Sequence, residues 1–155
     1  MGNSGIGVPL PELAAYCREA AAEGAVLLKN EGHMLPVKKD ETVSIFGRSQ
    51  IEYYRSGTGS GGAVNVPYVK NILDGIKENN VFPVNEELVE IYKEWLKEHP
   101  FDNGGGGWAA EPWHQAEMEI TDEIARRAAE KSEKAIFLIG RTAGEDKDYE
   151  DTEGS

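Results

Sequence analysis

Apolar positions recur with helical spacing in several segments of the chain. Between residues 10 and 23, alanine and larger apolar side chains lie three to four positions apart, and Pro11 stands where a first helical turn tolerates proline. The same spacing returns in three later segments, 67–77, 85–100 and 121–128. Asn85 and Thr121 precede the last two, where a side-chain oxygen can cap a helix. The pattern therefore predicts helices over all four segments.

Short apolar runs of a different kind lie between these helices. Residues 42–46 and 135–139 are rich in β-branched and aromatic side chains, and each run is closed by a glycine; 81–84 is a weaker third candidate. Strands separated by helices favour a mainly parallel open sheet with helices on both faces. Such sheets usually have about five or six strands. We therefore expect residues 1–155 to form a partial α/β domain.

Composition narrows the range of partners. A formal net charge of -12 makes nucleic acids and anionic lipid surfaces poor candidates, because both are themselves negative. The single cysteine, Cys17, has no partner for an internal disulfide, and its helical context predicts a small buried apolar role. No leader-like segment and no apolar run of membrane-spanning length is present, which favours a cytoplasmic location and no membrane partner.

Polar residues gather in the loops that follow the two main strands. In open α/β sheets the ligand lies beyond the carboxyl ends of the strands, so we expect these two loops to meet. The first, 48–66, is rich in glycine, serine and tyrosine, and the second, from Arg141 on, is acidic. Hydroxyls, glycines and carboxylates together suit a polyol or sugar, although most acidic runs are simply solvated loops. Glu145 stands out because it lies closest to the strand end.

Other site chemistries fit less well. Gly57, Gly59 and Gly62 match the spacing G-x-G-x-x-G of nucleotide loops, but they neither follow the strand directly nor open a helix. The acidic residues after Glu145 alternate as calcium ligands do, but Asp151 occupies the position that requires glycine. The histidines have no partners at metal-ligand spacing. We therefore expect neither a metal nor a cofactor.

Aromatic residues flank a flexible segment. Residues 104–107 are four consecutive glycines, which mark a loop, and Trp108 and Trp113 follow them. These tryptophans can equally form a platform for a sugar ring or anchor the loop to the protein.

Several segments together resemble one known family. They are the run 23–32 (EGAVLLKNEG) with Leu35-Pro36, the strand 43–47, the glycine-rich segment 56–62, and 139–141 leading to Gly144-Glu145. In order and spacing they are similar to the α/β sandwich domain of family 3 glycoside hydrolases, the β-glucosidases and β-xylosidases. The resemblance covers nearly the whole chain.

The resemblance implies a retaining hydrolysis of terminal β-linked glucose or a related sugar, shared between two domains. An aspartate nucleophile is expected on a barrel domain that this chain does not contain, and a glutamate of the sandwich serves as acid/base about 5 Å away. By its place in the motif the acid/base is Glu145, with Glu150 and Glu153 as alternatives. The residues expected to contact substrate are Arg48, Tyr54, Thr58, Trp108 and Arg141.

The domain order implied by the resemblance is the less common one. The sandwich motif begins close to residue 1, so a barrel is expected after residue 155, and 1–155 alone should be inactive. A non-catalytic carbohydrate-binding or assembly module remains the alternative. An incomplete sheet also predicts self-association, because an unpaired apolar edge favours pairing with another chain.

Overall fold

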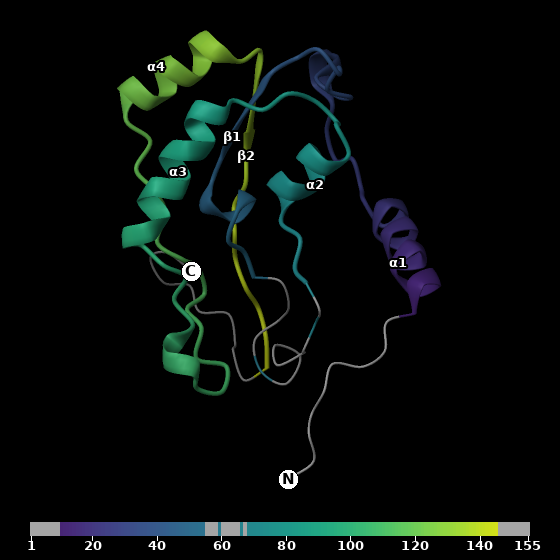
Figure 1. Cartoon of the computed structure of the whole chain (residues 1–155), viewed down its shortest axis with the longest axis vertical. Coiled ribbons are helices and arrows are strands. Elements are labelled where there is room, and N and C mark those ends of the chain that lie inside the picture. Colours follow the sequence, from purple (N-terminus) through teal and green to yellow (C-terminus); the bar gives the residue numbers. More distant parts are fainter. Residues whose placement is uncertain (1–9, 55–58, 60–65, 67, 146–155) are drawn as a thin grey trace. The chain divides into compact units, whose positions relative to one another are not determined.

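The computed structural model describes residues 10–54, 59, 66 and 68–145, which fall into two compact units described separately here (Figure 1). The smaller unit holds the residues up to Val37 together with residue 66. It contains helix α1 (Pro11–Glu23) and a short 3₁₀ turn η1 (Glu31–His33). Proline occupies the first turn of α1, as the sequence predicted.

The prediction that Cys17 is buried is wrong. The thiol is exposed, because α1 buries none of its residues.

The larger unit holds the described residues from Lys38 to Glu145, except residue 66. Its strands are β1 (Val43–Phe46) and β2 (Lys134–Phe137), and its α-helices are α2 (Ile72–Glu78), α3 (Glu86–Glu98) and α4 (Asp122–Lys131). Its loops include the 3₁₀ turns η2 (Arg48–Gln50) and η4 (Gly104–Gly106).

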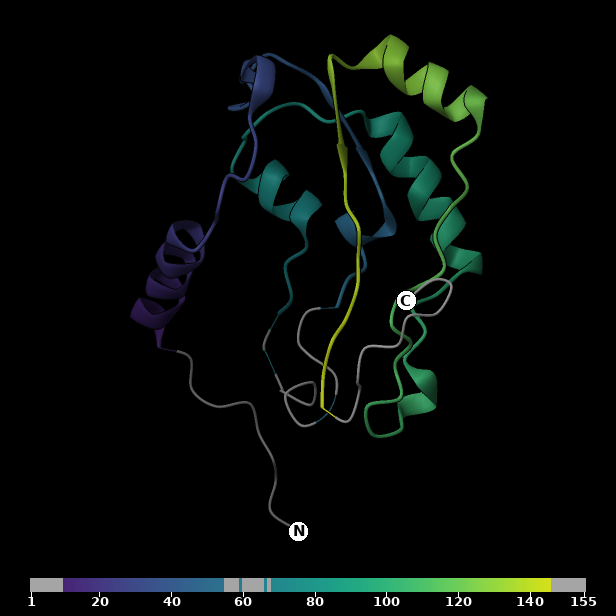
Figure 2. The same cartoon turned by 180° about the vertical axis from the view of Figure 1, so that it is seen from behind.

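The two strands run parallel, as predicted. Val43 pairs with Lys134 and Phe46 with Phe137, so both strands end at the same edge of the sheet. The predicted third strand is reduced to a single parallel bridge between Val43 and Val84. In both views α3 and α4 lie on one side of the strands and α2 on the other (Figures 1 and 2). This is a partial α/β fold.

Side-chain caps set where α2, α3 and α4 begin. The Asn85 side chain accepts a hydrogen bond from the Leu88 amide at the start of α3, and Thr121 does the same for Ile124 at the start of α4. Both caps were predicted. The helix predicted over 67–77 is shorter, because Asn71 caps it through the Asp74 amide and residues 68–71 are not helical.

The core joins α3 and α4 to β1. Its buried members are Phe46, Leu88, Tyr92, Met118 and Ala128. Tyr92 is fully buried, and the Gly47 amide donates a hydrogen bond of 2.8 Å to its hydroxyl oxygen. The core therefore anchors the end of β1, from which the first polar loop departs. Among the described residues, no helix has the length and apolar character needed to cross a membrane.

Candidate active site

Two glycines bring the loops after the strands together. We call residues 47–59 the β1 loop and residues 138–145 the β2 loop. A side chain on Gly47, at φ +102°, would collide with the carbonyl oxygen of Leu138, and one on Gly140 would collide with the Ser49 hydroxyl. Both glycines are needed for this close approach. The predicted meeting of the two loops is thus present at their bases.

A third segment joins them. The connection between α3 and α4, residues 99–121, is called the Trp108 loop here. The Thr142 amide of the β2 loop donates a hydrogen bond of 2.9 Å to the Trp113 carbonyl. From the sequence, Trp108 and Trp113 could form a sugar platform or anchor the loop. The hydrogen bond between the Thr142 amide and the Trp113 carbonyl was not predicted, because it depends on the path of the chain in three dimensions.

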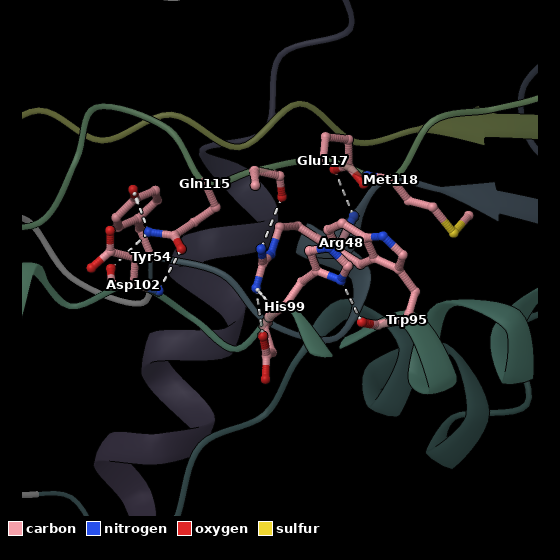
Figure 3. A network of polar contacts seen from close by, with 10 residues as sticks. Arg48, Tyr54, Trp95, His99, Asp102, Gln115, Glu117 and Met118 are labelled. Carbon is pink, nitrogen blue, oxygen red and sulfur yellow. Dashed lines mark hydrogen bonds and ion pairs between the residues drawn. The ribbon is translucent and has the colours of Figure 1, made fainter. Parts of the chain in front are cut away.

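Arg48 holds the base of the Trp108 loop to the β1 loop. Its side chain is buried, and its two terminal nitrogens donate hydrogen bonds of 2.8 Å and 3.0 Å to the carbonyls of Ala116 and His99. Its backbone amide also donates to the Glu117 carboxylate at 2.8 Å. Figure 3 shows these contacts at the two ends of the loop. Arg48 therefore bonds both ends of one connection.

Charge and ring contacts complete the surroundings of Arg48. The guanidinium donates to the Glu52 carboxylate at 2.8 Å, and its central carbon lies 5.5 Å from the centroid of the Trp95 ring. The Trp95 ring in turn stacks on the His99 ring, with centroids 4.2 Å apart. A paired guanidinium over an aromatic face is a stable arrangement for a buried arginine.

Tyr54 makes a second connection between the same loops. Its hydroxyl donates to the Pro112 carbonyl at 2.5 Å and accepts a hydrogen bond from the Gln115 side-chain amide at 2.9 Å. The buried Gln115 also pairs with the backbone of Asp102 in both directions (Figure 3). Burial raises the pKa of Tyr54 above its usual value, which keeps the phenol protonated as a donor.

The Glu145 side chain lies where the three loops converge. An ideal Cβ built on Gly59 would be 2.8 Å from both Cβ and Oε2 of Glu145, and 3.5 Å from Cζ2 of Trp108. Gly59 belongs to the β1 loop, Glu145 to the β2 loop and Trp108 to the third segment. Glu145 is exposed and the Trp108 side chain is 61% exposed, so both are accessible to a ligand. An accessible carboxyl group with an exposed aromatic ring nearby suits proton transfer to a bound sugar.

The predicted site residues thus divide into three groups. Glu145 and Trp108 both lie close to Gly59, whose nucleotide-like spacing with Gly57 and Gly62 fitted less well as a nucleotide site. Arg48 and Tyr54 point to the Trp108 loop, where their polar groups bond protein atoms; direct sugar contact by either one stays a prediction. Arg141 is exposed on the β2 loop. Thr58, Glu150 and Glu153 lie outside the described residues.

Two residues that position the site were missed in the sequence. Gln115 and Glu117 lie in a segment without periodicity, and only the burial of Gln115 reveals its role. Among the described residues, no group of three or more histidine, cysteine, aspartate or glutamate side chains is arranged to hold a metal ion.

Comparison with known families assigns the chain. Residues 25–154 match the family described as "Glycosyl hydrolase family 3 C-terminal domain". The chain belongs to this family. The resemblance identified from the sequence motifs is confirmed.

Relatives of this family 3 domain are β-glucosidases. It is 50% identical over 137 residues to "Beta-glucosidase" of Ruminococcus albus, a match that covers 88% of this chain and 14% of the relative. "Beta-glucosidase A" of Butyrivibrio fibrisolvens is 33% identical over 128 residues, covering 82% of this chain and 15% of the relative.

Solved structures of β-glucosidases also resemble this family 3 domain. A β-glucosidase from Paenibacillus barengoltzii superposes with a TM-score of 0.93 at 66% identity, covering 99% of this chain and 16% of that one. β-Glucosidase 3B from Thermotoga neapolitana, solved in complex with glucose, superposes with a TM-score of 0.77 at 31% identity, covering 94% and 20%. The family 3 domain described here thus matches only 14–16% of the length of three of these relatives.

Proposed function

We propose that the protein containing this family 3 domain is a retaining β-glycosidase that releases terminal β-D-glucosyl or related residues, and that Glu145 is its acid/base. The observation that supports this most directly is the position of the Glu145 carboxylate, next to Gly59 and Trp108 at the junction of three loops. Several relatives of the same family are named β-glucosidases.

The proposed reaction has two steps. In the first, a carboxylate of a barrel domain attacks the anomeric carbon, the bond to the leaving group breaks, and Glu145 gives its proton to the leaving oxygen. In the second, Glu145 takes a proton from water, whose oxygen displaces the enzyme carboxylate from the sugar. One carboxyl group thus acts first as acid and then as base. Trp108, which like Glu145 is exposed and lies close to Gly59, would border the leaving-group side of the pocket.

The test compares leaving groups in the full-length protein. We expect Glu145→Gln to lower kcat/KM for phenyl β-glucoside by about 10²- to 10⁴-fold, because phenolate is a poor leaving group without a proton. Activity on 2,4-dinitrophenyl β-glucoside should fall far less in the first step, since that leaving group needs no acid.

The alternative carboxylates serve as matched controls. Glu150→Gln and Glu153→Gln remove the same charge from the same acidic segment. We expect neither to change the ratio of the two kcat/KM values. If one of them shows the large selective loss and Glu145→Gln does not, the acid/base is that residue.

A carbohydrate-binding module without catalysis is the second candidate, and the 61% exposure of Trp108 favours it. A module of this kind should bind glucose or cellobiose by itself. Titration of the 1–155 chain, followed by tryptophan fluorescence, should then saturate, and Trp108→Ala should abolish the change. A flat titration would exclude this candidate.

A further inference from the structure

Gly59 occupies a place where a side chain has no room. The ideal Cβ position is 2.8 Å from both Cβ and Oε2 of Glu145 and 3.5 Å from Cζ2 of Trp108. Contacts of 2.8 Å are closer than Cβ atoms adopt, so an added methyl group must displace its neighbours. The Glu145 carboxylate can rotate away, but its Cβ is bonded to the backbone, so rotation alone does not relieve the contact.

The conformation of Gly59 is a separate requirement. Its φ of +87° is one that other residues rarely adopt. Gly105 has a similar φ of +75°, but no atom lies within 4 Å of its ideal Cβ position. The two glycines thus share the backbone requirement, and only Gly59 also contacts the carboxylate side chain. Alanine at position 105 therefore tests the effect of backbone strain alone, whereas alanine at position 59 also displaces Glu145.

We propose that Gly59 is a positioning residue for acid/base catalysis: its missing side chain allows the Glu145 carboxyl group to lie beside the edge of Trp108, facing the leaving group. This inference rests on the proposed function of Glu145. It gives the central glycine of the glycine-rich segment a role in proton transfer rather than in binding a phosphate. The nucleotide-like spacing of Gly57, Gly59 and Gly62 then needs no nucleotide.

Replacing Gly59 with alanine should impair only the catalytic steps that need proton transfer. With alanine at position 59, Glu145 must move, and a shift of about 1 Å in a catalytic group can lower the rate by 10²-fold. Only steps that need proton transfer should suffer. The nucleophile belongs to another part of the proposed active site, so attack on an activated glucoside should continue.

The experiment uses Gly59→Ala, Gly105→Ala and Glu145→Gln in the full-length protein. We expect Gly59→Ala to lower kcat/KM for phenyl β-glucoside by about 10- to 100-fold. Its kcat/KM for 2,4-dinitrophenyl β-glucoside should change by less than about threefold. Gly105→Ala should leave both values close to wild type.

Azide provides a readout that a purely structural defect would not move. As an anion it attacks the glycosyl-enzyme without a general base, so it should raise kcat of Gly59→Ala and Glu145→Gln on the dinitrophenyl substrate and yield glucosyl azide. Wild type and Gly105→Ala should not respond.

The outcomes separate this inference from the proposed function. If Glu145→Gln lacks the selective defect and the azide response, the acid/base assignment fails. If Glu145→Gln shows both and Gly59→Ala shows neither, only the role of Gly59 fails. Equal losses on both substrates, or loss of soluble protein with Gly59→Ala but not Gly105→Ala, would assign Gly59 to the fold and overturn the inference.

Discussion

At the residue scale, Arg48 shows how one side chain joins distant parts of the chain. It lies two residues after the end of β1, yet it bonds the carbonyl of His99 at the start of the Trp108 loop and that of Ala116 in the last part of the loop. Substrate contact by Arg48 was expected from the family resemblance and stays a prediction. The structure buries Arg48, since the neighbouring backbone carbonyls need donors and Trp95 offers its aromatic face.

Arg48→Lys tests this role. Lysine keeps the charge, but it cannot reach the Ala116 and His99 carbonyls and Glu52 with one planar group. Because buried acceptors would lose their donors, we expect the free energy of unfolding to fall by about 2–4 kcal/mol. Urea unfolding of the 1–155 chain measures this free energy.

Arg126→Lys is the control, because Arg126 pairs with Glu130 on the surface. This substitution should change the free energy of unfolding by less than about 0.5 kcal/mol. Equal losses of stability for the two changes would show that the hydrogen bonds of Arg48 to the Trp108 loop do not stabilise the fold.

At the element scale, capping residues predicted the starts of α3 and α4 correctly. A cap is a local hydrogen bond within a few residues, so the chain pattern reveals it without tertiary information. Asn85 also has a tertiary role, because its side-chain amide donates to the buried Ser44 hydroxyl in β1 at 3.0 Å. Asn85 therefore connects the start of α3 to the sheet as well as capping the helix. The capping bond of Thr121 connects only residues at the start of α4.

The two caps should therefore differ in energy. Thr121→Ala should lower the free energy of unfolding by about 1 kcal/mol, the usual loss for one capping bond. Asn85→Ala should lower it by about 2 kcal/mol, because the contact with Ser44 is lost as well. Urea unfolding of both variants gives the comparison, and a loss for Asn85→Ala no greater than for Thr121→Ala would exclude the tertiary contribution.

At the scale of the whole molecule, the larger unit exposes apolar surface near β2. Phe137 is 63% exposed although it stacks on Phe46, and Ile139 is 92% exposed. A groove of about 300 Å³ runs between β2 and α4, with Ile120, Ala125 and Phe137 among its lining residues. In the part of the chain that the structure describes, β2 pairs with β1 alone. An uncovered strand of this kind favours pairing with a second copy.

We accordingly expect the isolated 1–155 chain to self-associate. Its weight-average mass in sedimentation equilibrium should rise with concentration, because burying the exposed apolar side chains of two copies is favourable. Ile139→Lys should shift the association to higher concentration by adding like charges at the edge. Leu28→Lys is the matched control, since Leu28 is equally exposed but lies in the smaller unit. A mass that stays monomeric at all concentrations would contradict the prediction.

The sequence by itself determined the family, the parallel strands, the capped helices and the choice of Glu145 as candidate acid/base. These features depend on local hydrogen bonds, on side-chain periodicity and on short motifs, all of which involve residues that are close together in the sequence. The tertiary structure decided which groups meet: Arg48 and Tyr54 bond the Trp108 loop, and Gly59 lies against Glu145. Such contacts join residues tens of positions apart, and they depend on chain paths through segments without periodicity. For the same reason the exposure of Cys17, the single bridge at Val84 and the burial of Gln115 appeared only in three dimensions.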